Sequence, residues 1–284
     1  MTTALTTLGY SQGFIRCRAE SADPRLWDGL LGLWSPALGP TGATLRDWGR
    51  HESHAPLHAA MSWVQSPHGA TLNYPGSAAS QGLLIPNPAR YMPSVTTKRT
   101  YFAWCKPVDT AGQVLFAFAG TIPCAFARSN VAPNPQIHLG GGEYRYYAPG
   151  GWTLLKDGHW HSVAFLFDGY SAASTTLFID GLEQAIVSTT PGTPSAPTSF
   201  GIGRSSYGYE GLIGTAAVYD RLLTVGDLRQ LHADPVAWFQ PRRRITCRVS
   251  TATPHRVAVG QVFHTGTMAG QTFNTGQSVG QVHG

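Results

Sequence analysis

The chain has 284 residues, of which 12% are charged and 42% hydrophobic, with 33 glycines and 20 prolines. This composition favours a turn-rich, strand-rich domain and argues against a helical bundle, a coiled coil or a disordered chain. The formal net charge is +5, but residues 241–284 contain five arginines and no acid, so the first 240 residues are neutral. The charge therefore belongs to a C-terminal arm, which argues against nucleic acid as a partner.

We expect three zones: an N-terminal arm over residues 1–25, one domain over residues 26–240, and a basic, glycine-rich C-terminal arm over residues 241–284. The first residues lack the basic and apolar regions of a signal peptide, and no apolar run approaches the length of a membrane span. We therefore expect a soluble protein that is made in the cytoplasm without an export signal or membrane segment.

The cysteines show neither a CxxC pair nor metal-ligand spacing, so free thiols are expected. Cys105 and Cys124 lie in apolar strand contexts, where a buried, inert thiol is expected. The loop "HESHAPLH" brings together His51, His54 and His58 after an Asp47-x-Gly49 turn. It does not match H-E-x-x-H and it contains a proline, so a solvated loop is favoured over a zinc site.

Strand patterns fill the middle of the chain. The stretches "TYFAWCKPV" and "GQVLFAFAG" are predicted strands, and "GGGEYRYYAPGGW" is a predicted hairpin edge. From His161 to Phe167 apolar residues alternate, and turns at Asp168-Gly169 and Asp180-Gly181 predict a meander of three antiparallel strands. His159 and His161 flank Trp160 and are predicted as surface or edge residues. So many short strands bury enough surface only as two packed sheets.

A strand over 211–220 is predicted to lead into a short helix. Thr224 is its expected N-cap, with Asp227 three residues on, and Leu228 and Leu231 give it one apolar stripe. The Asp234-Pro235 pair ends it, because a residue before proline avoids the α region. We expect this helix to plug the sandwich. The stretch "GIGRSS" before the strand is followed by no helix, so it is not a phosphate-binding loop.

These stretches resemble the concanavalin A-like, laminin-G-like family. "GHWHSVAFLFDG" with "TTLFIDGLEQ", and "FGIGRSS" with "YEGLIGTAAVYDRLLTVGDLRQLHADP", are similar to its W-H-x-V-A strand, L-x-x-D-G hairpin, G-x-I strand and capping helix. The resemblance spans residues 26–240 and implies an all-β, two-sheet antiparallel jelly-roll sandwich with one short C-terminal capping helix and extended terminal arms. The chain departs from the family at Gly214-Thr215, where many members carry Asp-Glu. Calcium is thus an expectation from the family alone, without assigned ligands, and no other cofactor is expected.

Catalytic patterns are not evident in the sequence. Glycoside hydrolysis needs two facing carboxylates, and related glucanases carry E-x-D-x-x-E on one strand, which this chain lacks. Its acids stand singly in turns, caps and loops: Asp47, Glu143, Asp157, Asp168, Asp180 and Asp227. Aromatic residues in or beside expected loops are candidates for glycan binding, although packing between the sheets is the alternative. They are Tyr144, Tyr146, Tyr147, Trp152, Tyr207 and Tyr209.

The C-terminal arm repeats every ten residues. Gly-Gln recurs at 260, 270 and 280, and Phe recurs as Phe263 and Phe273. Such a unit is either a flexible tail or an extended segment that becomes ordered by pairing with another chain, and the repeated Phe favours the second. The segments "FIRCRAES" and "RITCRVST" also echo each other, which predicts that the two arms pair as strands and bring Cys17 near Cys247.

The ending "ADPVAWFQPRRR" looks like laminin-G-like proteins encoded by tailed bacteriophages. This resemblance implies a non-enzymatic virion protein, a capsid decoration or spike protein, whose jelly roll is displayed outward. Its partners would be the major capsid or other virion proteins and further copies of itself, with a trimer as the expected oligomer. The predicted assembly residues are Arg242, Arg243, Arg244, Arg248, Phe263 and Phe273. The alternatives are an adhesin that binds cell-surface glycans and, third, a glycosidase.

Overall fold

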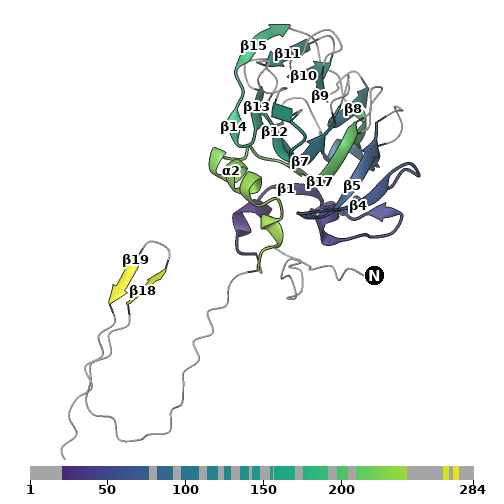
Figure 1. The fold of residues 1–284 in the computed structure, drawn as a ribbon. Coiled ribbons are helices and arrows are strands. Elements are labelled where there is room, and N and C mark those ends of the chain that lie inside the picture. The colour runs from purple at the N-terminus through teal and green to yellow at the C-terminus, as the bar shows by residue number, and fades with distance from the viewer. Residues whose placement is uncertain are drawn as a thin grey trace, which may run out of the picture. The chain divides into compact units, whose positions relative to one another are not determined.

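The computed structural model describes residues 21–76, 82–91, 97–108, 114–120, 125–128, 135–140, 143–147, 154–155, 157–169, 175–190, 197–203, 209–241, 265–268 and 271–274. The chain divides into two compact units, Met1–Arg243 and Arg244–Gly284. The described part of the first unit is built from antiparallel sheets and one short α-helix, as predicted (Figure 1). The second unit contains a hairpin of β18 (Thr265–Met268) and β19 (Gln271–Asn274).

An eight-stranded antiparallel sheet forms the first layer of the sandwich. Its order is β14-β13-β12-β7-β17-β5-β4, and β1 also pairs with β17. The strands are β1 (Leu30–Trp34), β4 (Ser62–Ser66), β5 (Gly69–Pro75), β7 (Arg99–Pro107), β12 (His161–Phe167), β13 (Thr175–Ile179), β14 (Leu182–Glu183) and β17 (Glu210–Tyr219). The predicted three-stranded meander is confirmed as β12, β13 and β14.

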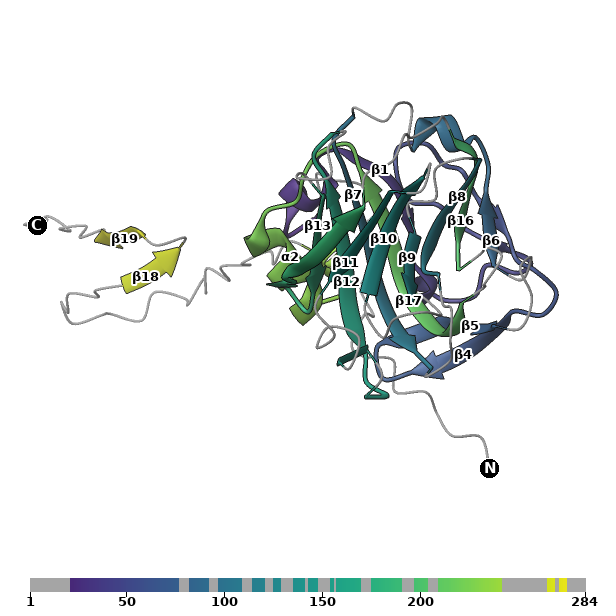
Figure 2. The same cartoon turned by 90° about the horizontal axis from the view of Figure 1, so that it is seen from above.

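Two smaller sheets form the second layer, as Figure 2 shows from above. Their orders are β6-β16-β8 and β15-β11-β10-β9. The strands are β6 (Leu83–Ile85), β8 (Phe116–Gly120), β9 (Ala125–Arg128), β10 (Pro135–Gly140), β11 (Glu143–Tyr147), β15 (Ile186–Thr190) and β16 (Pro197–Ile202). The predicted hairpin edge around residue 144 is β10 with β11. A short pair, β2 (Thr44–Leu45) and β3 (Ala55–Pro56), stands apart from these sheets.

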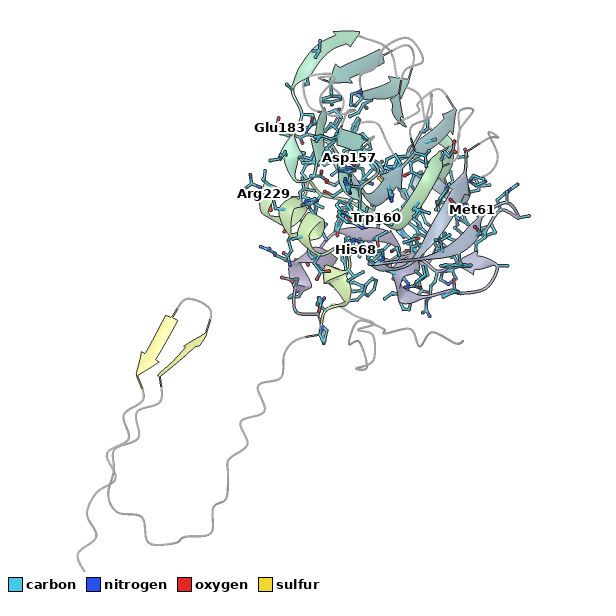
Figure 3. The ribbon with its side chains drawn as sticks, in the orientation of Figure 1. Met61, His68, Asp157, Trp160, Glu183 and Arg229 are labelled. Atoms are coloured by element: carbon cyan, nitrogen blue, oxygen red, sulfur yellow. The ribbon has the colours of Figure 1, made fainter. Side chains whose placement is uncertain are left out.

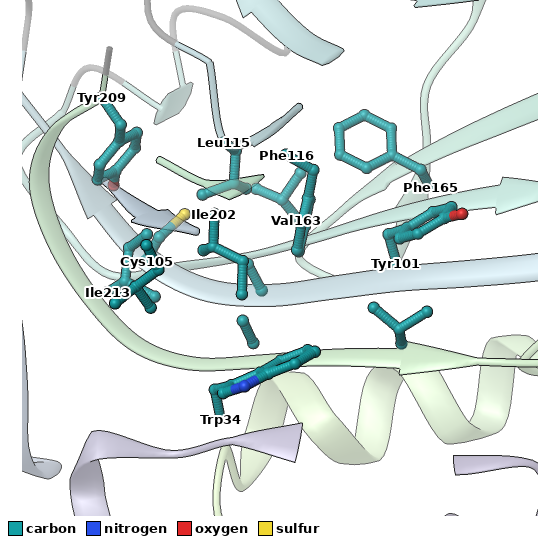
Figure 4. Close-up of a cluster of buried hydrophobic side chains, with 14 of the residues drawn as sticks. Trp34, Tyr101, Cys105, Leu115, Phe116, Val163, Phe165, Ile202, Tyr209 and Ile213 are labelled. Carbon is teal, nitrogen blue, oxygen red and sulfur yellow. The ribbon is translucent and has the colours of Figure 1, made fainter. Parts of the chain in front are cut away.

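The core between the layers follows from the two-residue period of the strands. Along β7, Tyr101, Ala103 and Cys105 face the second layer, where they meet inward residues such as Phe116 and Ile202 (Figure 4). The intervening Phe102 and Trp104 belong to a second cluster on the outer face of the same sheet. Because both faces are covered, almost every residue of β7 is buried.

Helix α2 (Val225–Ala233) lies over the outer face of the large sheet. The described residues also contain four short 3₁₀ turns: η2 (Pro24–Trp27), η3 (Pro36–Leu38), η4 (Pro88–Arg90) and η6 (Ala237–Phe239). As predicted, Thr224 and Asp227 form a reciprocal capping box, and the helix ends before Asp234. Leu228 and Leu231 pack in the outer cluster with Trp238. The helix therefore lies on the outer face of the large sheet and does not plug the sandwich, because its apolar stripe pairs with the outward residues of β7 and β12.

Candidate functional site

The start of β12 holds a buried histidine between two carboxylates. His161 is 4% exposed, its Nδ1 lies 2.7 Å from Asp180 Oδ2, and its Nε2 lies 2.9 Å from Asp157 Oδ1. Burial acts to lower the pKa of His161, but the hydrogen bonds and charges of Asp180 and Asp157 outweigh it and raise that pKa above its ordinary value. The prediction of a surface or edge residue was wrong for His161, because it shares the inward face of β12 with Val163 and pairs across from buried Cys105. His159 is exposed, as predicted.

This arrangement holds a proton and leaves no space for substrate between its acids. The imidazole ring fills the gap between the carboxylates of Asp157 and Asp180, where a glycosidic oxygen and a water would have to stand. Nearby, Ser162 Oγ lies 3.2 Å from His232 Nδ1, but Asp180 Oδ1 lies 3.3 Å from the same nitrogen. A nucleophilic triad needs the acid and the serine on opposite ring nitrogens, so this cluster does not have triad geometry.

An aromatic cluster lies beside it on the outer face of the large sheet. The rings of Trp104 and Trp160 are nearly parallel, 7° apart in plane, with centroids separated by 6.0 Å. His68, from the turn between β4 and β5, stands edge-on at 5.5 Å from Trp104 and 5.9 Å from Trp160 (Figure 3). His232 of α2 closes the other side at 5.7 Å from Trp104. His68 is exposed and Trp160 half-buried, so part of this cluster faces solvent.

Trp104 carries a polar group without a partner. Its Nε1–H is buried and has no hydrogen-bond acceptor among the described residues. A buried donor normally has a partner, and an unpaired one marks either strain or a place where a ligand or water completes the bond. The aromatic cluster of His68, Trp104, Trp160 and His232 is therefore the described surface whose chemistry best suits a ligand with apolar faces and hydroxyl groups.

The other acids singled out in the sequence have structural partners where the structure describes them. Asp168 pairs with Lys98 at 2.7 Å. Asp227 caps α2 and accepts from Arg221 at 3.2 Å. Asp47 is buried and accepts four hydrogen bonds, which come from the backbone of Leu33, Gly49 and Ser53 and from the hydroxyl of Tyr91. These roles are those of turn and cap residues.

The histidine-rich loop follows Asp47 and turns around its carboxylate. His54 Nδ1 accepts from the backbone N–H of Asp47 at 3.2 Å, His58 Nδ1 accepts from the N–H of Ala60, and the ring of His51 packs edge-on against Tyr91. Across the part of the chain that the structure describes, no three His, Cys, Asp or Glu side chains gather to hold a metal ion. The Gly214-Thr215 positions also do not fit calcium, since Gly214 has no side-chain oxygen and the Thr215 hydroxyl is bonded to Ser35.

The predicted glycan-binding aromatics fall into three groups. Tyr147 and Tyr209 are buried in the core, where the Tyr147 hydroxyl donates to the carbonyl of Thr175, so for these two the structure agrees with the alternative, packing between the sheets. Their inward positions on β11 and at the start of β17 explain the burial. Tyr144 and Tyr146 lie on β11, of which the backbone is described. Trp152 and Tyr207 lie outside the described residues.

Cys105 is a buried free thiol, as predicted. Burial raises its pKa to about 12, which keeps it protonated and unreactive at neutral pH. Cys17, Cys124 and Cys247 lie outside the described residues, and so do Arg242, Arg243, Arg244, Arg248 and Phe263. Phe273 lies on β19. No helix of the described chain is long and apolar enough to cross a membrane.

The two ends of the sandwich domain meet at one point. Ser21 and Pro241 form an antiparallel bridge, and the N–H of Ala22 donates to the carbonyl of Gln240 at 2.8 Å. The Ser21 hydroxyl and the Trp27 indole N–H both donate to the carbonyl of Trp238. The two arms therefore begin side by side.

Comparison with known proteins shows the family to which the domain belongs. A family model described as the concanavalin A-like lectin/glucanases superfamily matches residues 77–229, more than half of the chain. Among curated proteins the search finds no significant match.

Solved structures of the same fold are similar to this chain at low identity. Domain 4 of a GH43 extracellular arabinanase from Geobacillus stearothermophilus, in complex with arabinotriose, is 15% identical with a TM-score of 0.53, over 72% of this chain and 98% of that one. The binding domain of Paraclostridial Mosquitocidal Protein 1 is 10% identical with a TM-score of 0.52, over 76% and 56%. Trypanosoma rangeli sialidase is 14% identical with a TM-score of 0.49, and the match covers 72% of this chain and 32% of the sialidase. At these identities the likeness shows the fold alone.

Proposed function

The chain belongs to the concanavalin A-like lectin/glucanases superfamily, and on that premise we propose that it is a non-enzymatic virion structural protein of the capsid decoration or spike type. The terminal arms anchor it to the major capsid or other virion proteins, and the jelly roll is displayed outward. The observation that carries this proposal is the bridge between Ser21 and Pro241, which starts both arms from one point. A domain tethered at one point leaves the rest of its surface free for display.

The C-terminal arm has the properties of an attachment segment. It combines five arginines and no acid with a ten-residue repeat, and part of that repeat forms the strands β18 and β19. Extended segments that pair with another chain bury a large interface without a large globular contact, and arginines add charge-assisted contacts to an acidic neighbour. We propose that the chain has no enzymatic role. Asp157 and Asp180 are the two carboxylates whose arrangement most resembles a hydrolytic pair, and both are hydrogen-bonded to the ring of His161.

Sedimentation with virus particles tests the proposal. Particles from a lysate that contains this protein would be stripped of it and then mixed with the full chain, with an Arg242→Ser, Arg243→Ser, Arg244→Ser variant, or with a control that changes Arg46, Arg90 and Arg229 to Ser. The control changes the net charge equally on exposed sites of the domain. We expect the control to sediment with particles and the arm variant to be lost. Equal sedimentation of both variants, or no sedimentation of the wild-type chain, would contradict the proposal.

Carbohydrate binding is the second candidate, and the aromatic cluster of His68, Trp104, Trp160 and His232 favours it. Sugars stack on indole faces, and the half-buried Trp160 gives this cluster an indole at the solvent side. The arabinanase domain that shares the fold was determined with arabinotriose, so this sandwich can carry a sugar site. A glycan array with the wild-type chain, Trp160→Ala, and Trp63→Ala as a control tryptophan on β4 tests this candidate. Loss of a signal in Trp160→Ala alone supports it, and a silent array at high protein concentration rejects it.

A further inference from the structure

One side of the sandwich presents an unusual amount of aliphatic surface. Leu182 is 58% exposed, Ile186 47% and Val187 59%, and all three lie within six consecutive residues. We call this stretch, Leu182 to Val187, the β14–β15 edge. Large aliphatic side chains exposed singly are ordinary, but three in one short segment are a concentration of apolar surface of the kind that marks an interaction site.

The two strands of this stretch are also terminal strands of their sheets, one in each layer of the sandwich. β14 is the terminal strand of the eight-stranded sheet, and β15 is the terminal strand of the β15-β11-β10-β9 sheet (Figure 1). β15 pairs with β11 on one side and with no described strand on the other. Exposed edge strands are usually protected by proline, lysine or a covering element, but residues 182–190 contain neither proline nor lysine and only one charge, Glu183. Among the described residues, no strand pairs with this side of β15, so the edge can accept an added strand.

The C-terminal repeat is a segment that needs such a partner. β18 and β19 are four residues each and pair only with one another among the described strands. A two-stranded hairpin alone is marginally stable in water, and it gains stability by joining a larger sheet. The five residues of β15 match the four-residue repeat strands in length. Each repeat also places Phe at the same position, which provides an anchor for an aliphatic patch.

We propose that the β14–β15 edge receives a strand of the C-terminal repeat from a second copy of this chain. Other described strands also end their sheets, but among them only this edge carries three exposed large aliphatic side chains. The sequence starts a repeat three times, at 260, 270 and 280, so one chain carries more repeats than its own copy of this edge takes up. The added strand extends the sheet by backbone hydrogen bonds, and Phe263 or Phe273 lies on Leu182, Ile186 and Val187. This inference rests on the proposed function, since it uses the arm as an attachment device.

The contact joins two different surfaces, an edge on one copy and a tail on the next. Such a heterologous contact closes into a ring when the rotation between copies allows it, and otherwise continues as a chain of copies. A ring of this kind would explain how the predicted homo-oligomer forms from a domain tethered at one point.

Complementation between two full-length variants tests the proposal. The edge variant, Ile186→Lys with Val187→Lys, keeps an intact tail, because a lysine on an edge strand blocks strand addition. The tail variant, Phe263→Ser with Phe273→Ser, keeps an intact edge. The control is Val108→Lys with Val225→Lys, which alters two valines of similar exposure, 47% and 42%, away from the edge. Thermal unfolding of each variant checks that the domain remains folded.

Analytical ultracentrifugation over a range of concentrations provides the readout. We expect the wild-type chain and the control to self-associate, and the association constant of each of the other variants alone to fall by at least about tenfold. Mixing the edge variant with the tail variant should form a one-to-one complex, because the first supplies a tail and the second an edge.

Each other outcome overturns the proposal. Normal association of the tail variant together with none of the edge variant would mean that two edges pair directly. A monomeric wild-type chain whose β15 amides lose protection from hydrogen exchange in the tail variant would mean that the edge takes its own tail. A monomeric chain without that protection would mean that the edge has another occupant. If complementation fails while the arm arginines still govern sedimentation with particles, this inference falls and the proposed function stands.

Discussion

Gly214 lies against the indole of Trp104, where a side chain would fit only if the neighbouring rings shifted. A Cβ built on Gly214 would be 3.0 Å from Trp104 Cδ1 and 3.4 Å from the ring of Trp160. Gly214 also coincides with an irregularity in the pairing of β17 with β7, between Ile213 and Thr215. A glycine at this position therefore favours the close approach of the two tryptophans across the sheet.

We predict that Gly214→Asp destabilises the domain and disrupts the tryptophan pair. Trp104 is 5% exposed and packs against His68 and His232, so the added side chain overpacks the site at a cost of about 1–3 kcal/mol. Urea unfolding measures the loss, and near-ultraviolet circular dichroism reports the indole pair. The control is Gly226→Ala in α2, where the added Cβ would lie 3.6 Å from its nearest neighbour, the hydroxyl of Thr224. The expected effect of this control on the free energy of unfolding is neutral to stabilising. Equal effects of the two changes would contradict the prediction.

We predict that Asp47→Asn costs about 3 kcal/mol of folding free energy. Oδ1 accepts from the N–H groups of Leu33 and Gly49, and Oδ2 accepts from the N–H of Ser53 and the hydroxyl of Tyr91. An amide replaces one acceptor by a donor, so buried donors lose their partner. Asp168→Asn is the matched control: it breaks only the exposed pair with Lys98, worth at most about 1 kcal/mol. Denaturant titrations of both variants check the difference, and a small loss in Asp47→Asn would show that the loop closes without this carboxylate.

Local patterns in the sequence were sufficient for the strands, the turns and the helix cap. Asp180-Gly181 makes its turn and Thr224 caps its helix through neighbours within three residues, so the sequence window contains the cause. The burial of His161 depends on β7 across the sheet and on two acids placed by separate turns. Its alternation with Val163 was a usable signal for an inward position, but the flanking of Trp160 by two histidines suggested a surface. The aromatic cluster was missed because Trp104 and His68 meet only after β4, β5 and β7 join one sheet.

We predict that the site formed by His161, Asp157 and Asp180 makes the free energy of unfolding depend on pH. The raised pKa of His161 means that its contribution is complete below the unfolded value near 6.5 and is lost as pH rises through the folded pKa. For Asp157, burial acts to raise the pKa, but the hydrogen bond with His161 prevails and lowers it. The Asp157 contribution is therefore present above the unfolded value of 3.8 and is lost as pH falls through the folded pKa. The site should stabilise the domain most between those two unfolded values, with a slope of up to about 1.4 kcal/mol per pH unit per proton above them.

The free energy of unfolding of wild type and His161→Gln, measured in urea from pH 4 to 9, checks this dependence. The difference between the two proteins should shrink as pH rises above neutrality. His159→Gln is the control, since His159 is exposed two residues away, and its profile should follow that of wild type. His232 Nδ1 lies 3.3 Å from Asp180 Oδ1, so His161→Gln is compared again in a His232→Gln background. A difference that is constant with pH would mean that the pKa of His161 is the same in the folded and unfolded states, which would contradict the prediction.

The bridge between Ser21 and Pro241 sets a register that the arms would keep if they continue to pair. In that register Cys17 would face Ile245 and lie diagonal to Cys247, and diagonal Cα atoms are roughly 7–8 Å apart. A disulfide needs about 4.4–6.8 Å, so we predict that the native cysteines form an intramolecular bridge slowly on mild oxidation. Ile245→Cys in a Cys247→Ser background should bridge to Cys17 faster, because the two residues would stand directly opposite. Peptide mass spectrometry after timed oxidation with diamide measures both rates. If the native pair bridges faster, the register of the arms differs by two residues from the one set by Ser21 and Pro241. If all disulfide products are intermolecular, the arms separate beyond Ser21 and Pro241.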